Sequence, residues 1–253
     1  SAMWPSIRPI VPRNNSGVKT ERDDTLVDID AQQLLGRAQS LTDLSLTPED
    51  IVARTGVHEK NTWTVARRRG QFAPASSDRV LSLLYRLFDR RLIYWDPAMM
   101  GAPGVRFVRH LLPRPFGDGG EDRLALVVQR ARPITTIATV TRGIASSDVT
   151  SYWCHVYPLR LADPSAEGQL FAADGGWREH LHEGIRRRLA TAFGRTVDVE
   201  AFAWYVCAVL PSPTYRRAHP AEPAPATPPV PSPPHPTSAA ALAPPLAAAP
   251  APP

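Results

Sequence analysis

A proline- and alanine-rich stretch at the carboxyl end most constrains how this chain can fold. Residues 220–253 hold half of the 28 prolines, no aromatic residue and, apart from His235, a single ionisable side chain, Glu222. Proline lacks a backbone N–H and alanine buries little apolar surface, so this stretch cannot build a packed core. We therefore expect residues 218–253 to form a disordered tail, partly in polyproline II conformation.

The body that precedes the tail has enough apolar sequence for a core, because 43% of the chain is hydrophobic. No run approaches the roughly 18 to 20 apolar residues of a membrane helix, and no basic-then-apolar signal peptide opens the chain. We therefore expect a cytoplasmic protein with no membrane partner. The start at Ser1-Ala2 instead of methionine suggests a fragment.

Helix start signals dominate the first seventy residues. Asp30 is a candidate N-cap for a short helix, and Thr47-Pro48 opens another with proline in its first turn. Residues 61–69 are a candidate third helix. Later helices are expected over residues 105–112, 177–193 and 198–210.

Strands are expected where β-branched and aromatic residues gather, at residues 124–129, 134–141 and 152–161. Helices and strands are thus largely segregated along the chain. This order predicts an α+β fold, in which a mixed sheet carries flanking helices and follows a small helical N-terminal part.

Several kinds of site are not supported by the sequence. Cys154 and Cys207 have no CxxC spacing, so we expect buried small side chains, without a disulfide or a zinc site. His180 and His182 are two residues apart and would point about 200° from each other on a helix, so we expect no metal there.

The loops that methyl transfer and ATP hydrolysis require are missing from the sequence. There is no glycine-rich loop for S-adenosylmethionine, no Asn/Asp-Pro-Pro-aromatic loop for a flipped adenine, and no GxxxxGK[ST] loop. Residues 96–98 and 163–165 begin like the adenine loop but lack its second proline and its aromatic residue. We therefore expect no catalytic residue and no cofactor in this chain.

Arginine dominates the positive charge. The net charge is +5, and only Lys19 and Lys60 of the 29 basic residues are lysines. The planar guanidinium meets phosphate oxygens or a guanine edge with two hydrogen bonds, which favours nucleic-acid contact. A GC-rich genome, which raises arginine, alanine and proline together, would produce the same bias.

Arginines alternate with aromatic residues over residues 84–95. As one extended strand, this segment would place two sets of side chains on opposite faces. One set is Arg86, Phe88, Arg90 and Tyr94, and the other is Tyr85, Asp89, Arg91 and Ile93. The pattern suits contact with phosphates and base edges. The alternative is that an Arg–Asp pair only pins the strand to a neighbour.

Four blocks, in the same order along the chain, carry a family resemblance. Residues 85–94 resemble the YRPFDxRxxYY signature of type ISP restriction-modification enzymes and related adenine-N6 DNA methyltransferases. Residues 16–23 are similar to their SxGxxTxRD junction, residues 157–159 to their FPLYL strand, and residues 208–216 to their AVLHSPTYR helix end. Together the blocks span roughly residues 4–217.

The resemblance implies the C-terminal specificity region, which recognises DNA beside a methyltransferase domain. Residues 1–76 would be the junction and small helical region after that domain, and residues 77–217 the target-recognition domain. The implied partners are double-stranded DNA and the parent's methyltransferase domain, with S-adenosylmethionine bound by the parent enzyme. The candidate DNA-binding residues are Lys19, Thr20, Arg22, Arg68, Arg69, Arg86, Arg90, Arg91, Tyr94, Tyr215 and Arg216.

Two other interpretations remain open at this point. The chain could be a structural module whose basic surface docks on its own methyltransferase domain, or an inactive remnant of a broken gene. Salt distinguishes DNA binding from apolar docking, because only the release of counterions from DNA makes affinity fall steeply with salt concentration.

Overall fold

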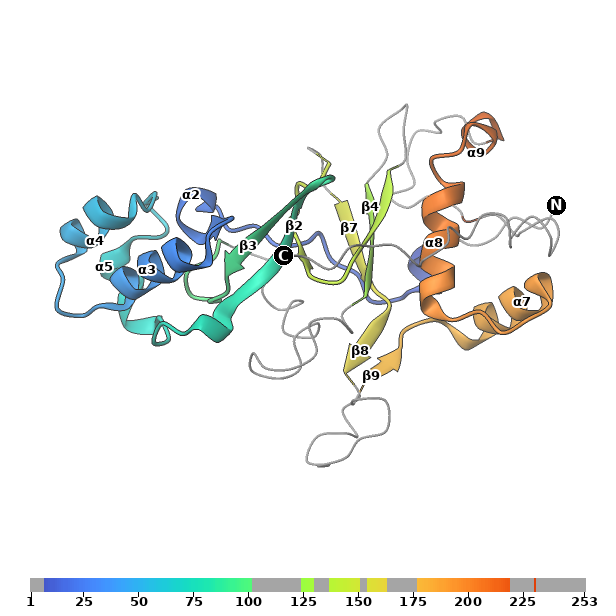
Figure 1. Ribbon diagram of the computed structural model, residues 1–253, viewed down its shortest axis with the longest axis horizontal. Helices are drawn as coiled ribbons and strands as arrows, with labels where there is room; N and C mark the ends of the chain where they lie inside the picture. Colours follow the sequence, from blue (N-terminus) through green and yellow to red (C-terminus); the bar gives the residue numbers. More distant parts are fainter. Residues whose placement is uncertain are drawn as a thin grey trace.

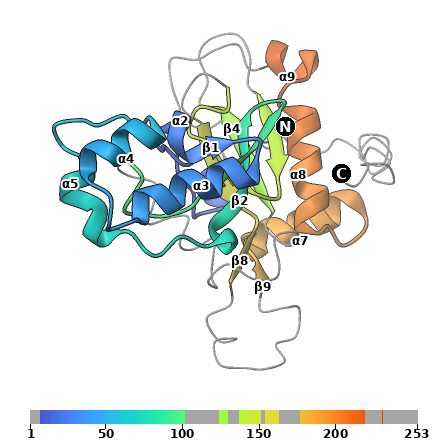
Figure 2. The same ribbon diagram turned by 60° about the vertical axis from the view of Figure 1, so that its left-hand side comes forward.

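The computed structural model describes residues 7–101, 124–129, 137–150, 154–162, 177–218 and 230. Strands lie in the middle of this part of the molecule and helices lie at its two ends (Figures 1 and 2). The predicted α+β class is confirmed. The helix expected at residues 105–112 and nearly all of the tail lie outside the described residues.

A four-stranded mixed sheet forms the first half of the molecule. Its order is β1 (Val27–Asp28), β3 (Asp89–Tyr94), β2 (Val80–Arg86) and β6 (Ile144–Ala145). Strand β3 runs antiparallel to both of its neighbours, whereas β6 runs parallel to β2. The parallel strand comes from far along the chain, so this sheet is completed by a late segment.

The arginine-rich segment is a hairpin, and the prediction of one extended strand is wrong. The chain reverses at Leu87 and Phe88, so that Arg86 pairs with Asp89, and the register shifts between Leu84 and Arg86. Among the described residues, only Glu21 has a positive φ without being glycine, so the turn uses negative φ values. A register shift of this kind supplies the strand twist that such a turn does not provide by itself.

A second sheet occupies the middle of the molecule. Its order is β5 (Ala138–Thr141), β4 (Ala125–Gln129) and β7 (Cys154–Pro158), all antiparallel. The strand expected at residues 124–129 is confirmed. The strand expected at residues 152–161 is interrupted at Leu159, after which β8 (Arg160–Ala162) pairs with β9 (Trp177–Glu179).

Two adjacent helices cover the far end of this second sheet. Helix α7 (Glu183–Phe193) begins six residues later than predicted, because β9 occupies the start of the predicted range 177–193. The His182 side chain caps the helix by accepting a hydrogen bond from the Gly184 N–H. Helix α8 (Val199–Val209) lies within the predicted range 198–210, is capped by Asp198, and is followed by α9 (Pro213–Ala218).

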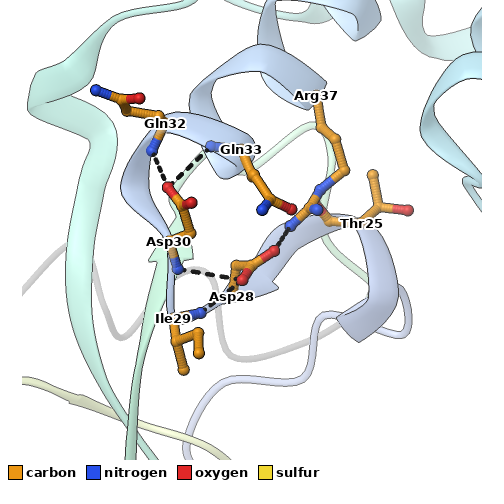
Figure 3. Close-up of polar contacts among 7 residues, drawn as sticks. All are labelled: Thr25, Asp28, Ile29, Asp30, Gln32, Gln33 and Arg37. Atoms are coloured by element: carbon orange, nitrogen blue, oxygen red, sulfur yellow. Dashed lines mark hydrogen bonds and ion pairs between the residues drawn. The ribbon is translucent and has the colours of Figure 1, made fainter.

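The N-terminal helices follow their capping residues. Asp30 accepts hydrogen bonds from the backbone N–H groups of Gln32 and Gln33 and so starts α3 (Ala31–Thr42) (Figure 3). Thr47 and Asp50 form a reciprocal capping box at the start of α4 (Pro48–Thr55). Both predicted caps are confirmed.

The third predicted helix is short. Only α5 (Val65–Arg68) and a following 3-10 turn over Arg69–Gln71 are helical within residues 61–69. The remaining helical elements are single turns. They are α1 (Ile7–Ile10), α2 (Asp23–Leu26) and a 3-10 turn at Ser77–Arg79.

Two main apolar cores define two lobes. The core of the N-terminal lobe, residues 16–101, packs α3, α4 and α5 against the first sheet and includes Leu34, Trp63 and Ile93. The core of the C-terminal lobe packs α1, α7 and α8 against the second sheet. That lobe comprises residues 7–15 and the described residues from 124 to 218. A small third core, which includes Leu84, Val127 and Ala145, joins the two sheets.

One position corrects the expectation of a tail without a core. Val230 is fully buried within the apolar core of the C-terminal lobe. The tail therefore contributes at least one core side chain.

Candidate nucleic-acid interface

The junction block and the hairpin block meet in space. The Asp23 carboxylate accepts a short hydrogen bond from the Thr20 hydroxyl and another, at 2.9 Å, from the Tyr85 hydroxyl. Burial raises the pKa of Tyr85, and the hydrogen bond to Asp23 raises it further. Two of the four motif blocks thus form one polar cluster that holds the hairpin close to its turn.

Gly17, in the junction block, occupies a backbone position that a residue with a side chain would not fit. Its φ is +82°, and a Cβ atom there would lie 2.7 Å from the Ser146 carbonyl oxygen. The Val18 N–H donates to the Ala145 carbonyl at 2.8 Å, and the Ser147 N–H donates to the Val18 carbonyl at 2.8 Å. The junction therefore runs alongside β6, at a distance that only glycine allows.

Arg22 lies inside the N-terminal lobe and is only 3% exposed, so this burial does not favour the DNA contact that the sequence predicted, and that role stays a prediction. Its guanidinium lies 3.5 Å from the centre of the Trp63 ring and donates to the Thr20 and Met99 carbonyls at 3.2 and 3.4 Å. Burial lowers its pKa. Cation–π stacking and two carbonyl acceptors give Arg22 a structural role.

The end of the hairpin presents charged side chains that differ in how they are held. The guanidinium carbons of Arg86 and Arg91 lie 4.1 and 4.3 Å from the centre of the Tyr85 ring. Arg91 also pairs with Asp89 at 2.8 Å, and the two side chains are 37% and 36% exposed. A pair this exposed contributes little stability. Arg90 is exposed.

The other candidate contacts divide by burial. Tyr94 is fully buried and its hydroxyl accepts from the Ser76 N–H at 3.2 Å, while Thr20 and Tyr215 are 4% and 7% exposed. These three side chains are enclosed in the fold, so the structure does not place them at the surface, and their role as DNA contacts stays a prediction. Lys19 is exposed, and the Arg216 side chain lies outside the described part of the chain.

Arg68 and Arg69 are half-buried and are both used locally. Arg68 donates to the Gln71 side chain at 3.0 Å. Arg69 donates to the Leu46 carbonyl at 2.9 Å and to the Asp43 carbonyl at 3.3 Å, and so holds the loop between α3 and α4. These hydrogen bonds show that both guanidinium groups stabilise nearby loops, whereas their contact with phosphates stays a prediction.

A pocket of about 260 Å³ opens where the junction, the hairpin and the turn after β6 come together. Lys19, Asp23, Tyr85 and Asp148 contribute to its lining. The lining mixes both signs of charge, and Asp23 is already satisfied by Thr20 and Tyr85. The pocket therefore belongs to the polar cluster that fixes the hairpin.

Charge is distributed unequally between the lobes. The N-terminal lobe has 12 basic and 12 acidic side chains, whereas the described C-terminal lobe has 11 arginines against five carboxylates, a net charge of +6. The motif-based prediction missed the exposed arginines of this second lobe. A separate charge count for each lobe would have found them. They include Arg8, Arg13, Arg178, Arg187, Arg188 and Arg195.

Among the described residues, no group of three His, Cys, Asp or Glu side chains is placed to hold a metal ion. No described helix is long and apolar enough to span a bilayer.

Burial raises the pKa of Cys154 to about 12 and that of Cys207 to about 12. Cys154 is 1% exposed, so its predicted burial is confirmed.

The chain belongs to the family described as the type ISP C-terminal specificity domain, whose model matches residues 9–243. This match spans nearly the whole chain and confirms the resemblance drawn from the four sequence blocks. A comparison with curated proteins found no match.

Solved structures share the fold. The similar ones include the cryoEM structure of a DrdV–DNA complex (TM-score 0.55, 17% identity) and the ATP-dependent type ISP restriction-modification enzyme LlaBIII bound to DNA (TM-score 0.59, 14% identity). A nuclease-deletion mutant of the type ISP enzyme LlaGI with a DNA substrate mimic gives a TM-score of 0.51 at 13% identity. Each match covers 83% of this chain but only 20%, 13% and 19% of those chains. This chain therefore corresponds to a small part of each of those proteins.

Proposed function

We propose that this chain is the DNA target-recognition part of a restriction-modification adenine-N6 methyltransferase and is non-catalytic by itself. The observation that carries the proposal is the match to the specificity-domain family over residues 9–243. Methyl transfer would belong to a methyltransferase domain elsewhere in the parent enzyme. That domain would bind S-adenosylmethionine, since the sequence of this chain lacks both loops that the reaction needs.

The structure supports a division of labour within this proposal. The net charge of +6 on the C-terminal lobe provides long-range attraction and phosphate contacts. The hairpin presents Arg86 and Arg90 at the end of two paired strands, and the Tyr85–Asp23 bond holds the hairpin close to its turn. Phosphate contacts would position the domain on the duplex, while a subset of side chains would read base edges.

A salt titration tests the proposal. The affinity of the whole chain for a mixed-sequence DNA duplex is measured by fluorescence anisotropy over a series of salt concentrations. We expect log affinity to fall linearly with log salt, by about 0.9 for each phosphate contacted. Absence of binding at low salt, or an affinity that salt does not change, would contradict DNA recognition.

One observation favours a second candidate function, a module that docks on its own methyltransferase domain. The N-terminal lobe is electrically neutral, and three of its large apolar side chains are exposed, Ile29 at 79%, Leu44 at 71% and Phe88 at 96%. Apolar side chains on a neutral surface suit protein contact better than phosphate contact. Salt-insensitive association with the parent's methyltransferase domain, weakened in Leu44→Ala, would support this function.

A further inference from the structure

The turn of the β2–β3 hairpin exposes an aromatic ring. Phe88 is 96% exposed, more than any other large apolar side chain among the described residues. Exposure of a phenylalanine costs hydrophobic free energy that a polar residue at this position would avoid. The ring at this position therefore calls for a functional explanation.

Two arginines lie near Phe88 along the hairpin. Arg86 and Arg90 lie two residues to either side of Phe88 in sequence, and Arg86 is held by its stacking on Tyr85 and a 2.8 Å hydrogen bond to the Tyr85 carbonyl. Arg90 is exposed on the opposing strand, where it pairs with Leu84. The hairpin end thus combines a projecting apolar ring with two flanking positive charges.

The hairpin end is also held in place before any partner binds. Strands β2 and β3 pair along most of their length, and the Tyr85 hydroxyl is tied to Asp23 at 2.9 Å. Asp23 in turn accepts from Thr20 of the junction. A preorganised tip loses little conformational entropy when it binds, so more of the contact free energy appears as affinity.

We propose that Phe88 is a wedge that stacks on or inserts between bases of duplex DNA, while Arg86 and Arg90 contact the flanking phosphates. This inference rests on the proposed DNA-recognition function. The positive charges complement the DNA backbone, and a base step accommodates a single apolar side chain at a cost in unstacking. A protein partner fits less well, because one ring between two arginines lacks the contiguous apolar surface of a stable interface.

The test compares two duplexes of about three helical turns, one fully paired and one with a single central mismatch. A mismatch lowers the cost of unstacking, so a wedge should bind the mismatched duplex more tightly. We expect the wild-type chain to prefer the mismatched duplex by about tenfold. We expect Phe88→Ala to lose this preference and to weaken binding to the paired duplex by about tenfold.

Two control variants separate the wedge from its surroundings. Leu44→Ala removes another exposed large apolar side chain of the same lobe and should bind both duplexes like the wild-type chain. Arg90→Ala should reduce the slope of log affinity against log salt by about one unit, whereas Phe88→Ala should leave the slope unchanged because an uncharged ring displaces no counterions. Circular dichroism melts establish that each variant is folded.

The outcomes distinguish this inference from the function on which it rests. If the wild-type chain binds neither duplex at low salt, the proposed function itself is wrong. If the wild-type chain binds DNA and Phe88→Ala binds each duplex as tightly as the wild-type chain does, with the same mismatch preference, the wedge is wrong while DNA recognition stands. A loss of affinity in Phe88→Ala with the preference intact also overturns insertion, since the ring would then touch DNA without unstacking it.

Discussion

The two lobes contain almost the same number of basic side chains but use them differently. In the N-terminal lobe, 12 basic residues face 12 acidic ones, and several arginines are tied inside the lobe, such as Arg22 under Trp63 and Arg37 on Asp28. In the C-terminal lobe, 11 arginines face only five carboxylates. The number of arginines in a segment therefore does not by itself predict a DNA contact. The balance of charge and the burial of each guanidinium separate arginines that serve the fold from those that face solvent.

The largest expected effect tests this difference directly. Replacing Arg178, Arg188 and Arg195 of the C-terminal lobe together by alanine should weaken DNA binding about a thousandfold at low salt, because each phosphate contact is a charged hydrogen bond. The slope against log salt should fall by about 2 to 3 units in anisotropy titrations. The matched control is the triple change of Arg54, Arg67 and Arg68 in the N-terminal lobe. An equal or greater loss in that control would invalidate the comparison between the lobes.

The close contact of the junction with β6 is tested by a substitution at Gly17. Gly17→Ala places a Cβ atom 2.7 Å from the Ser146 carbonyl at a φ of +82°, so it should lower the free energy of unfolding by about 3 kcal/mol or more. Urea denaturation measures the change. Gly36→Ala, in α3 with nothing within 4 Å, should instead stabilise by about 0.5 to 1 kcal/mol. Equal effects at the two glycines would contradict the close approach.

Buried and exposed arginines of the N-terminal lobe should behave oppositely. Arg22→Ala removes a ring contact and two carbonyl hydrogen bonds, and should cost about 2 to 3 kcal/mol of stability while the folded protein binds DNA normally. Arg90→Ala should change stability by no more than about 0.5 kcal/mol. Urea unfolding measures the stability of both variants, and fluorescence anisotropy measures their affinity for DNA. Weak DNA binding by folded Arg22→Ala would restore its role as a contact.

The core of the C-terminal lobe is tested through the tail. Val230→Ala removes two methyl groups from a fully buried side chain and should cost about 2 kcal/mol. Deletion of residues 219–253 should cost at least as much, as measured by thermal melting. A deletion that leaves the melting temperature unchanged would show that Val230 contributes nothing to this core.

The smallest effect concerns the acid stability of the N-terminal lobe. The Arg37 guanidinium, 2.5 Å from the Asp28 carboxylate, lowers the pKa of Asp28 below its ordinary value of 3.8 (Figure 3). A carboxyl group whose pKa is lower in the folded than in the unfolded protein stabilises the fold at any pH above its unfolded-state pKa. This stabilisation disappears as the pH falls through the folded-state pKa. Asp28→Asn should therefore cost about 1 kcal/mol near neutral pH and less at about pH 2. The exposed Asp24→Asn is the control. If both variants lose stability in the same way as the pH falls, the Arg37–Asp28 pair is not the source of the acid sensitivity.

Much of the fold could be predicted from local sequence. The caps at Asp30, Thr47 and Asp198 mark helix starts because their side chains satisfy N–H groups within the next three residues. The strand at residues 124–129 follows from a short run of buried apolar residues. Family membership could be predicted too, since four blocks in a fixed order do not depend on the details of packing.

Only the tertiary structure decided which motif residues reach the surface. The segment from Leu84 to Trp95 alternates regularly, yet the chain turns at Leu87 and Phe88, because strand pairing over a hairpin satisfies more backbone groups than one long strand. Arg22 and Tyr94 resemble contact residues in sequence but are enclosed by segments far along the chain. Burial depends on such distant neighbours, whereas caps and turns depend on adjacent residues. For this reason the sequence by itself determined the class and the family, and the packing of the lobes determined which arginines face outward.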